Sequence, residues 1–219
     1  ITFNLILKKF FLFFSYNPQV GRFLPLIFGF LSIPALSYLT FQIQKGKSYV
    51  FVAFLSSINF YLISYSQELR SYSLTFLLSI LSIIFFYKVF ENKISLNKKV
   101  FYSILYILVS LLGVCIHIFF FIIIISQITY LLLNYFFNKK KIIFNFVCII
   151  CVVIFYFLLM LESLLLQLRI DDFWITQIEP EFFINYYFSR FFGSKIMGAI
   201  YLFILLVLIF LNKKKIFHF

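Results

Sequence analysis

The feature that most constrains the fold is an apolar stretch from Tyr49 to Tyr87 whose only charged residues are Glu68 and Arg70. As one helix it would be roughly 58 Å long at about 1.5 Å per residue, nearly twice a hydrocarbon core of about 30 Å. The stretch must therefore cross a membrane twice. Because unpaired charges at mid-bilayer would cost several kcal/mol each, the segment Ser66 to Tyr72, the polar island, is predicted to be the turn between the two crossings.

The rest of the chain has the composition of a membrane protein. Hydrophobic residues make up 64% of the 219 and charged residues only 12%, about half of what a soluble domain carries. The net charge of +12 comes from basic residues clustered between apolar runs, which is the positive-inside pattern and not that of a nucleic-acid-binding protein. We therefore expect an all-α, polytopic transmembrane helical bundle that forms a single domain over residues 1–219.

Basic residues set the predicted topology. The lysine clusters are expected inside and all four arginines outside, which leaves the N-terminus outside and the C-terminus inside. Those clusters are Lys45 and Lys47, then Lys88, Lys93, Lys98 and Lys99, then Lys139 to Lys141, then Lys213 to Lys215, and the arginines are Arg22, Arg70, Arg169 and Arg190. The seven predicted spans are 20–43, 49–66, 70–88, 100–116, 118–137, 142–165 and 195–212.

Two segments outside these spans are predicted to lie on the outer surface of the membrane. Residues 1–17 carry apolar side chains at helical spacing around Lys8 and Lys9, which indicates an interfacial helix. Residues 169–195 form an outer loop in which an aromatic stripe beside Glu181 indicates a second interfacial helix.

Three polar residues at the outer ends of the spans are candidates for chemistry. Glu68 and Arg70 would diverge on a regular helix, but at a turn both can face a common cavity, where an arginine fork suits a phosphate. An equally weighted alternative is that Glu68 and Arg70 are solvated charges of a turn and bind no ligand. His117 ends the 100–116 span at the same level, where it either binds a phosphate or sugar hydroxyl or simply anchors the turn.

The outer loop adds weaker candidates. Trp174 either stacks on a sugar or anchors the loop in the interface. Asp171 and Asp172 are adjacent, so their carboxylates point apart, and no metal site is predicted, although a divalent metal stays open as an alternative. The cysteines lie inside apolar runs, which favours neither a disulfide nor zinc: Cys115, Cys148 and Cys151.

Four segments together resemble a known family. Ser66 to Tyr72 resembles the Ser-x-Glu-x-Arg-x-Tyr signature of bacterial GT-C glycosyltransferases, the group that contains the lipid A aminoarabinose transferase and relatives of protein O-mannosyltransferases. Residues 21–34 are similar to that family's entry into its second span. His117, followed ten residues on by Gln127, resembles its Thr-His-Tyr segment, and Phe173 to Ile175 resembles its Phe-Trp-Ile triplet. Ile116 stands where the family has Thr, so the match around His117 is partial.

The resemblance implies a function. It implies an inverting transferase, without a cofactor, that moves a sugar from a polyprenyl-phosphate carrier to a lipid, glycan or protein acceptor at the outer face of a bacterial inner membrane. Arg70, Glu68, His117 and Tyr72 would contact the donor phosphate, and Trp174 and Arg169 the sugar or acceptor. The family's acidic base would lie before Ile1, so we expect a fragment, shortened at both ends and inactive alone. The alternatives are a transporter or flippase of lipid-linked sugars, which predicts broken helices at mid-membrane, and a non-catalytic membrane scaffold.

Overall fold

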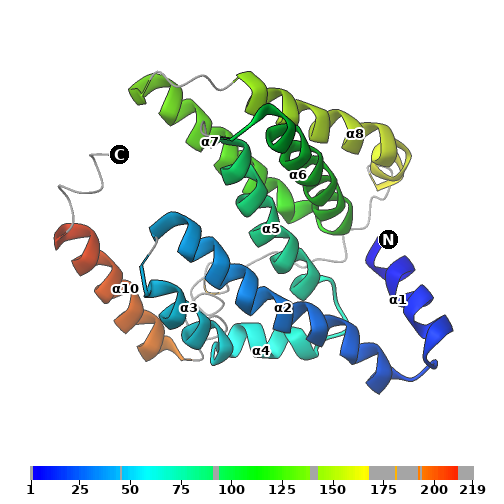
Figure 1. Ribbon diagram of the computed structural model, residues 1–219. Helices are drawn as coiled ribbons and strands as arrows, with labels where there is room; N and C mark the ends of the chain where they lie inside the picture. The colour runs from blue at the N-terminus through cyan, green and yellow to red at the C-terminus, as the bar shows by residue number, and fades with distance from the viewer. Residues whose placement is uncertain are drawn as a thin grey trace.

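A computed structural model describes residues 2–44, 46–90, 94–138, 143–167, 181, 192 and 194–211, and within these ranges the regular structure is helical throughout (Figure 1). The elements are α1 (Thr2–Phe13), α2 (Pro18–Gln44), α3 (Ser48–Ser57), α4 (Phe60–Gln67), α5 (Tyr72–Phe90), α6 (Leu96–Ile116), the short 3-10 turn η1 (Ile118–Phe120), α7 (Phe121–Asn138), α8 (Ile143–Gln167) and α10 (Lys195–Leu211). The predicted all-α class is confirmed for these residues.

Five helices are long and apolar enough to cross a membrane, namely α2, α5, α6, η1 continued by α7, and α8. The number is six if α3 and α4, which meet at an angle of 51°, together form one crossing. The seventh predicted span begins at Lys195, where α10 begins, but α10 has 17 residues, at the lower limit for a crossing. Seven spans therefore stay a prediction.

The helices alternate in direction, which gives the bundle two distinct ends. At one end the Lys88 Nζ donates a hydrogen bond to the Gln42 Oε1 at 2.8 Å, so α2 and α5 finish together. At the other end the rings of Tyr72, which begins α5, and His117, which follows α6, lie 5.6 Å apart. We call these the lysine end and the island end. Figure 1 shows α5 in the middle, with α2 on one side and α6 on the other.

The sequence predicts a span over 49–66, and in the structure the helix of this segment is broken at Ile58 and Asn59. α3 ends at Ser57, and α4 begins after Asn59, whose side-chain oxygen accepts a hydrogen bond from the Leu62 N–H at 3.1 Å. This is the capping contact that starts a new helix. A residue that caps a helix inside an apolar run therefore divides the run into two bent pieces.

The predicted division of the apolar run from Val100 to Phe137 is confirmed as two helices, and the loop between them is almost absent. α6 ends at Ile116 and η1 begins at Ile118, with only His117 in extended backbone between them. The Phe120 ring turns back into the bundle and occupies the space that a side chain on Gly113 would need. Phe120 is almost completely buried, so the missing side chain of Gly113 allows the sharp corner.

α1 packs its apolar stripe on the bundle. Phe3 is buried, Ile6, Leu7 and Phe10 pack beside it, and the Thr2 hydroxyl donates to the Cys115 carbonyl at 2.9 Å. Lys8 and Lys9 are exposed on the opposite face. This contact holds α1 at the island end, and its position relative to a lipid interface stays a prediction.

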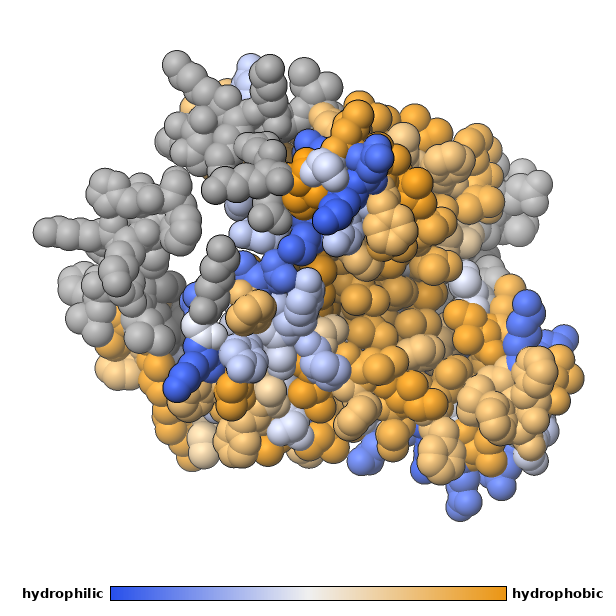
Figure 2. Space-filling model, viewed as in Figure 1, coloured by the Kyte–Doolittle hydropathy of each residue, from blue (hydrophilic) through white to orange (hydrophobic). Residues whose placement is uncertain are grey.

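Large apolar side chains are exposed on the outer faces of the helices, including Phe30, Phe101, Ile122 and Leu158. Figure 2 shows a broad hydrophobic surface across the middle of one face, with hydrophilic residues gathered in separate patches. Such a surface needs a lipid environment. The long apolar helices and their exposed faces fit an integral, multi-pass membrane protein.

Four buried polar side chains join three helices in the interior. The Tyr106 hydroxyl donates to the Gln127 Oε1 at 2.7 Å, the Gln127 Nε2 donates to the Ser82 Oγ at 3.1 Å, and the hydroxyls of Ser82 and Ser110 lie 2.9 Å apart. Hydrogen bonds between helices supply specific association where lipid and apolar side chains are equally hydrophobic. This polar cluster therefore fixes the register of α5, α6 and α7.

Replacing Gln127 by Leu is expected to lower the free energy of unfolding by about 1–2 kcal/mol, because the hydroxyl of Tyr106 would then be buried without its partner. Unfolding of the reconstituted protein by denaturant measures the effect. Ser126→Ala, on the same helix but exposed, is the control and should change stability by less than about 0.5 kcal/mol. Equal effects of the two substitutions would show that the cluster does not hold the helices together.

Candidate functional site

A cavity of about 300 Å³ lies at the island end. Its walls come from α2, α4, α5 and the corner between α6 and α7. Four α5 residues at helical spacing, Tyr72, Thr75, Phe76 and Ser79, form one wall. The remaining lining residues are Gly29 on α2, Tyr61, Leu62 and Tyr65 on α4, Ser73 on α5, and His117 and Phe119 at the corner.

A continuous row of rings, the aromatic ladder, runs along the cavity. The ring centroids of Tyr61 and Tyr65 are 4.3 Å apart, those of Tyr65 and Tyr72 are 4.8 Å apart, and His117 lies 5.6 Å from Tyr72 and 5.2 Å from Phe119. These separations fall within or close to the range of favourable aromatic contacts. The ladder therefore connects the polar island to the α6–α7 corner.

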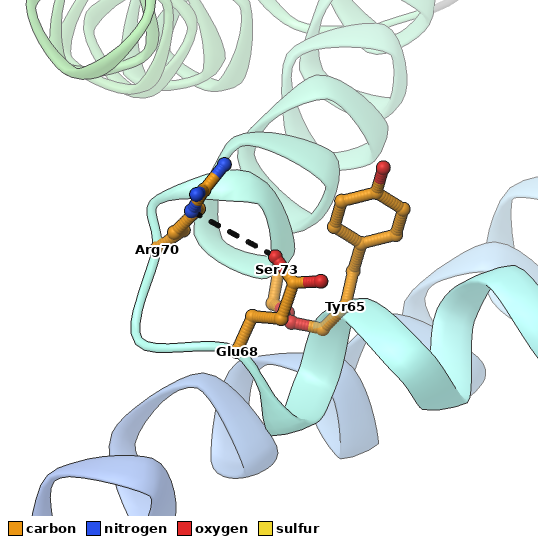
Figure 3. A network of polar contacts seen from close by, with 4 residues as sticks. All are labelled: Tyr65, Glu68, Arg70 and Ser73. Atoms are coloured by element: carbon orange, nitrogen blue, oxygen red, sulfur yellow. Dashed lines mark hydrogen bonds and ion pairs between the residues drawn. The ribbon is translucent and has the colours of Figure 1, made fainter. Parts of the chain in front are cut away.

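Short-range contacts shape the polar island (Figure 3). The backbone N–H of Arg70 donates a hydrogen bond to the backbone carbonyl of Glu68 at 2.7 Å, which makes a tight turn. The Ser73 hydroxyl donates to the Tyr65 carbonyl at 2.8 Å and so ties the start of α5 to the end of α4. Leu69 points the other way and occupies, with Phe11, the space that a side chain on Gly21 would need. The turn is therefore anchored while its charged side chains remain outside.

The two charges of the island lie beside the cavity and do not line it. The Arg70 Nε is 3.9 Å from the Glu68 Oε2, and the side chains are 68% and 44% exposed. A pair this long and this exposed adds little stability. The hydrogen-bonding contact with Tyr72, and then the neighbouring Glu68 carboxylate, raise the pKa of Arg70. Arg70 is thus a permanent cation next to a cavity-lining tyrosine, with its guanidinium accessible to a ligand.

His117 both anchors the turn and faces the cavity, so the structure combines the two interpretations left open by the sequence. Its Nδ1 accepts a hydrogen bond from the Phe119 N–H at 3.3 Å, and its carbonyl accepts one from the Phe120 N–H at 2.9 Å. Burial lowers the pKa of His117. The imidazole is therefore neutral at pH 7, and because Nδ1 is the acceptor, its proton is on Nε2.

The depressed pKa predicts a pH dependence. Because the folded protein holds His117 at a lower pKa than the unfolded chain does, the unfolded chain binds more protons as the pH falls below about 6.5. Stability should therefore be complete well above about pH 6.5 and decrease as the pH falls below that value. Thermal unfolding measured across this range should show a slope that His117→Asn reduces, because Asn still caps a turn but does not titrate.

His218→Asn is the matched control for this measurement, since it removes the other histidine of the chain. It should leave the slope unchanged. A slope that persists in His117→Asn would assign the titration to another group.

Of the predicted site residues, the structure brings together Glu68, Arg70, Tyr72 and His117 at the island end. Arg169 and Trp174, with Asp171 and Asp172, lie outside the described residues. Sequence reasoning missed the cavity-lining Tyr61, Tyr65, Thr75 and Ser79. Their spacings, four residues apart on α4 and three or four apart on α5, were the available signal. Within the described part of the chain, no group of three or more His, Cys, Asp or Glu side chains could hold a metal ion.

The arrangement offers a fixed cation, a neutral N–H donor and a set of hydroxyls around an aromatic-walled space. It suits a ligand with an anionic group and an adjoining polar ring. A search of protein-family models, of curated proteins and of solved structures finds no match to this chain. The similarity to GT-C glycosyltransferases therefore rests on the sequence motifs and their spacing.

Proposed function

We propose that this chain is the donor-binding part of a membrane glycosyltransferase, which moves a sugar from a polyprenyl-phosphate carrier to a lipid, glycan or protein acceptor. The island end would face the outside of a bacterial inner membrane. The observation that carries the proposal is the contact of Tyr72 with His117 at a cavity beside Arg70, because it joins two segments that resemble GT-C motifs and are far apart in the sequence.

In the proposed reaction, an acceptor hydroxyl or amine attacks the anomeric carbon from the face opposite the phosphate. The bond from that carbon to the phosphate oxygen breaks, and the electron pair leaves with the phosphate. Arg70 would stabilise the growing negative charge, and the His117 Nε2–H would donate a hydrogen bond to it. The proton of the acceptor would go to a carboxylate acting as general base, as the resemblance to GT-C glycosyltransferases implies.

Binding of a sugar-free, short-chain polyprenyl phosphate to this chain in lipid nanodiscs tests the donor site directly. Arg70→Ala is expected to weaken binding at least about tenfold, because the charge-assisted fork would be lost. Lys9→Ala removes an exposed cation from the same end of the bundle and should change affinity by less than about twofold. Equal losses would show attraction to positive charge in general and would overturn a specific phosphate site.

A transporter of lipid-linked sugars is the second candidate, since the break between α3 and α4 is of the kind found at transport sites. The two functions differ in covalent chemistry. A flippase would move the intact lipid-linked sugar across a vesicle membrane, whereas the proposed enzyme would release polyprenyl phosphate. Translocation without release, measured on the full-length protein in vesicles, would favour the transporter.

A further inference from the structure

Three hydroxyls of the cavity wall already donate their protons to backbone carbonyls. The Ser73 hydroxyl donates to the Tyr65 carbonyl at 2.8 Å, that of Thr75 to the Ser71 carbonyl at 2.9 Å, and that of Ser79 to the Thr75 carbonyl at 2.8 Å. A hydroxyl has one proton and two acceptor lone pairs. Towards the cavity, these side chains therefore act as hydrogen-bond acceptors.

The opposite wall is aromatic. Tyr61 and Tyr65 lie four residues apart on α4 and both line the cavity. Among the described residues that line it, none carries a full charge at neutral pH, because His117 is neutral and Arg70 and Glu68 stay outside. An anionic group placed against Ser73, Thr75 and Ser79 would meet acceptors where it needs donors, and burial without compensation is costly for a charge.

We infer that this cavity takes the sugar ring of the donor, that the ring is not anionic, and that Thr75 and Ser79 help to select it. The inference rests on the proposed function, which places the phosphate outside the cavity at Arg70. The sugar hydroxyls donate to Thr75 and Ser79, while the C–H face of the ring packs on Tyr61 and Tyr65. A volume of about 300 Å³ is at the lower end of the range of ligand pockets and suits one ring, not a polyprenyl chain.

Glucose and glucuronate provide a matched pair of probes, because they differ only in whether the exocyclic carbon is a hydroxymethyl group or a carboxylate. We expect short-chain polyprenyl phosphate carrying glucose to bind the chain in nanodiscs at least about tenfold more tightly than the glucuronate analogue. Thr75→Val should weaken binding of the glucosyl lipid about fivefold and leave binding of the sugar-free lipid unchanged. Ser79→Ala should act in the same direction.

Two further variants control for folding. Thr75→Ser keeps the hydroxyl and should bind like the parent. Thr40→Val removes a hydroxyl that is bonded to the preceding turn in the same way, to the Leu36 carbonyl at 3.0 Å, but does not line the cavity. It should also bind like the parent. Loss of glucosyl-lipid binding in Thr40→Val or in Thr75→Ser would show that packing, and not the cavity hydroxyl, is responsible.

Equal or tighter binding of the glucuronate lipid, or no effect of Thr75→Val, would overturn the inference while leaving the phosphate site intact. Failure of every polyprenyl phosphate to bind would instead overturn the proposed function. In that case, saturation-transfer NMR with methyl glucoside and methyl glucuronide tests whether the cavity binds a sugar ring without the lipid. Contact of the glucoside alone, lost in Thr75→Val, supports the sugar cavity, and contact of both or of neither overturns it.

Discussion

Arg70→Lys in the full-length protein is expected to lower sugar transfer about a hundredfold, while the protein inserts in the membrane as before. A guanidinium holds two phosphate oxygens through a planar fork, whereas an ammonium is a point charge with less orientation. A contact to charge that develops in the transition state acts on the rate of transfer, so its loss appears directly in that rate. The net charge does not change, and Arg70 is an exposed residue of a turn, so insertion has no reason to fail.

The measurement uses a polyprenyl-phosphate sugar donor at saturating acceptor, with the amount of inserted protein determined for each variant. Lys9→Ala, exposed at the same end, should retain the activity of the parent. Activity of Arg70→Lys within about twofold of the parent would show that Arg70 is a solvated turn residue that does not hold the phosphate.

Gly29→Ala is expected to lower the free energy of unfolding by about 1–3 kcal/mol and to impair binding at the cavity, which Gly29 lines. An added Cβ at Gly29 would lie 2.6 Å from the Cβ of Ser66. Because a Cβ is fixed to its backbone, neither atom can turn away, and α4 must move off α2. That shift would also displace Tyr61 and Tyr65.

Thermal unfolding and binding of the glucosyl lipid measure the two effects. Gly46→Ala is the matched control, since an added Cβ there would meet no atom closer than 3.6 Å. The double variant Gly29→Ala with Ser66→Gly restores the space and should recover part of the stability. Unchanged unfolding and binding in Gly29→Ala would mean that the close approach of α2 and α4 does not shape the cavity.

The sequence was sufficient to predict most of the long helices, although not the break between α3 and α4. The length of the apolar run around His117 was enough to predict two helices, because no single helix of that size fits a bilayer. Charge placed the turn at Glu68 and Arg70, since ionised groups are expelled from hydrocarbon. Both predictions depend on the membrane as a solvent, and they required no knowledge of which helices touch.

The cavity and the polar cluster could not be predicted for a related reason. In a membrane the outward face of a helix is as apolar as the inward face, so hydropathy does not show which side of α4 or α5 points inward. Tyr61 and Tyr65 carry little signal in a chain that is 24% aromatic. The partners of Gln127 come from two other helices, and only the packing of α5, α6 and α7 brings them together.

The sharp corner at Gly113 and Phe120 has a mechanical consequence for the cavity. His117 is held there by hydrogen bonds on both sides and by a buried ring beneath it. α4, on the other side, is a helix of eight residues without a fully buried side chain, joined to α3 at a bend. Elements with few buried contacts open at the lowest free energy. The two walls of the cavity therefore differ in how they are held, and the free energy of local opening is expected to be lower on the α4 side than at the His117 corner.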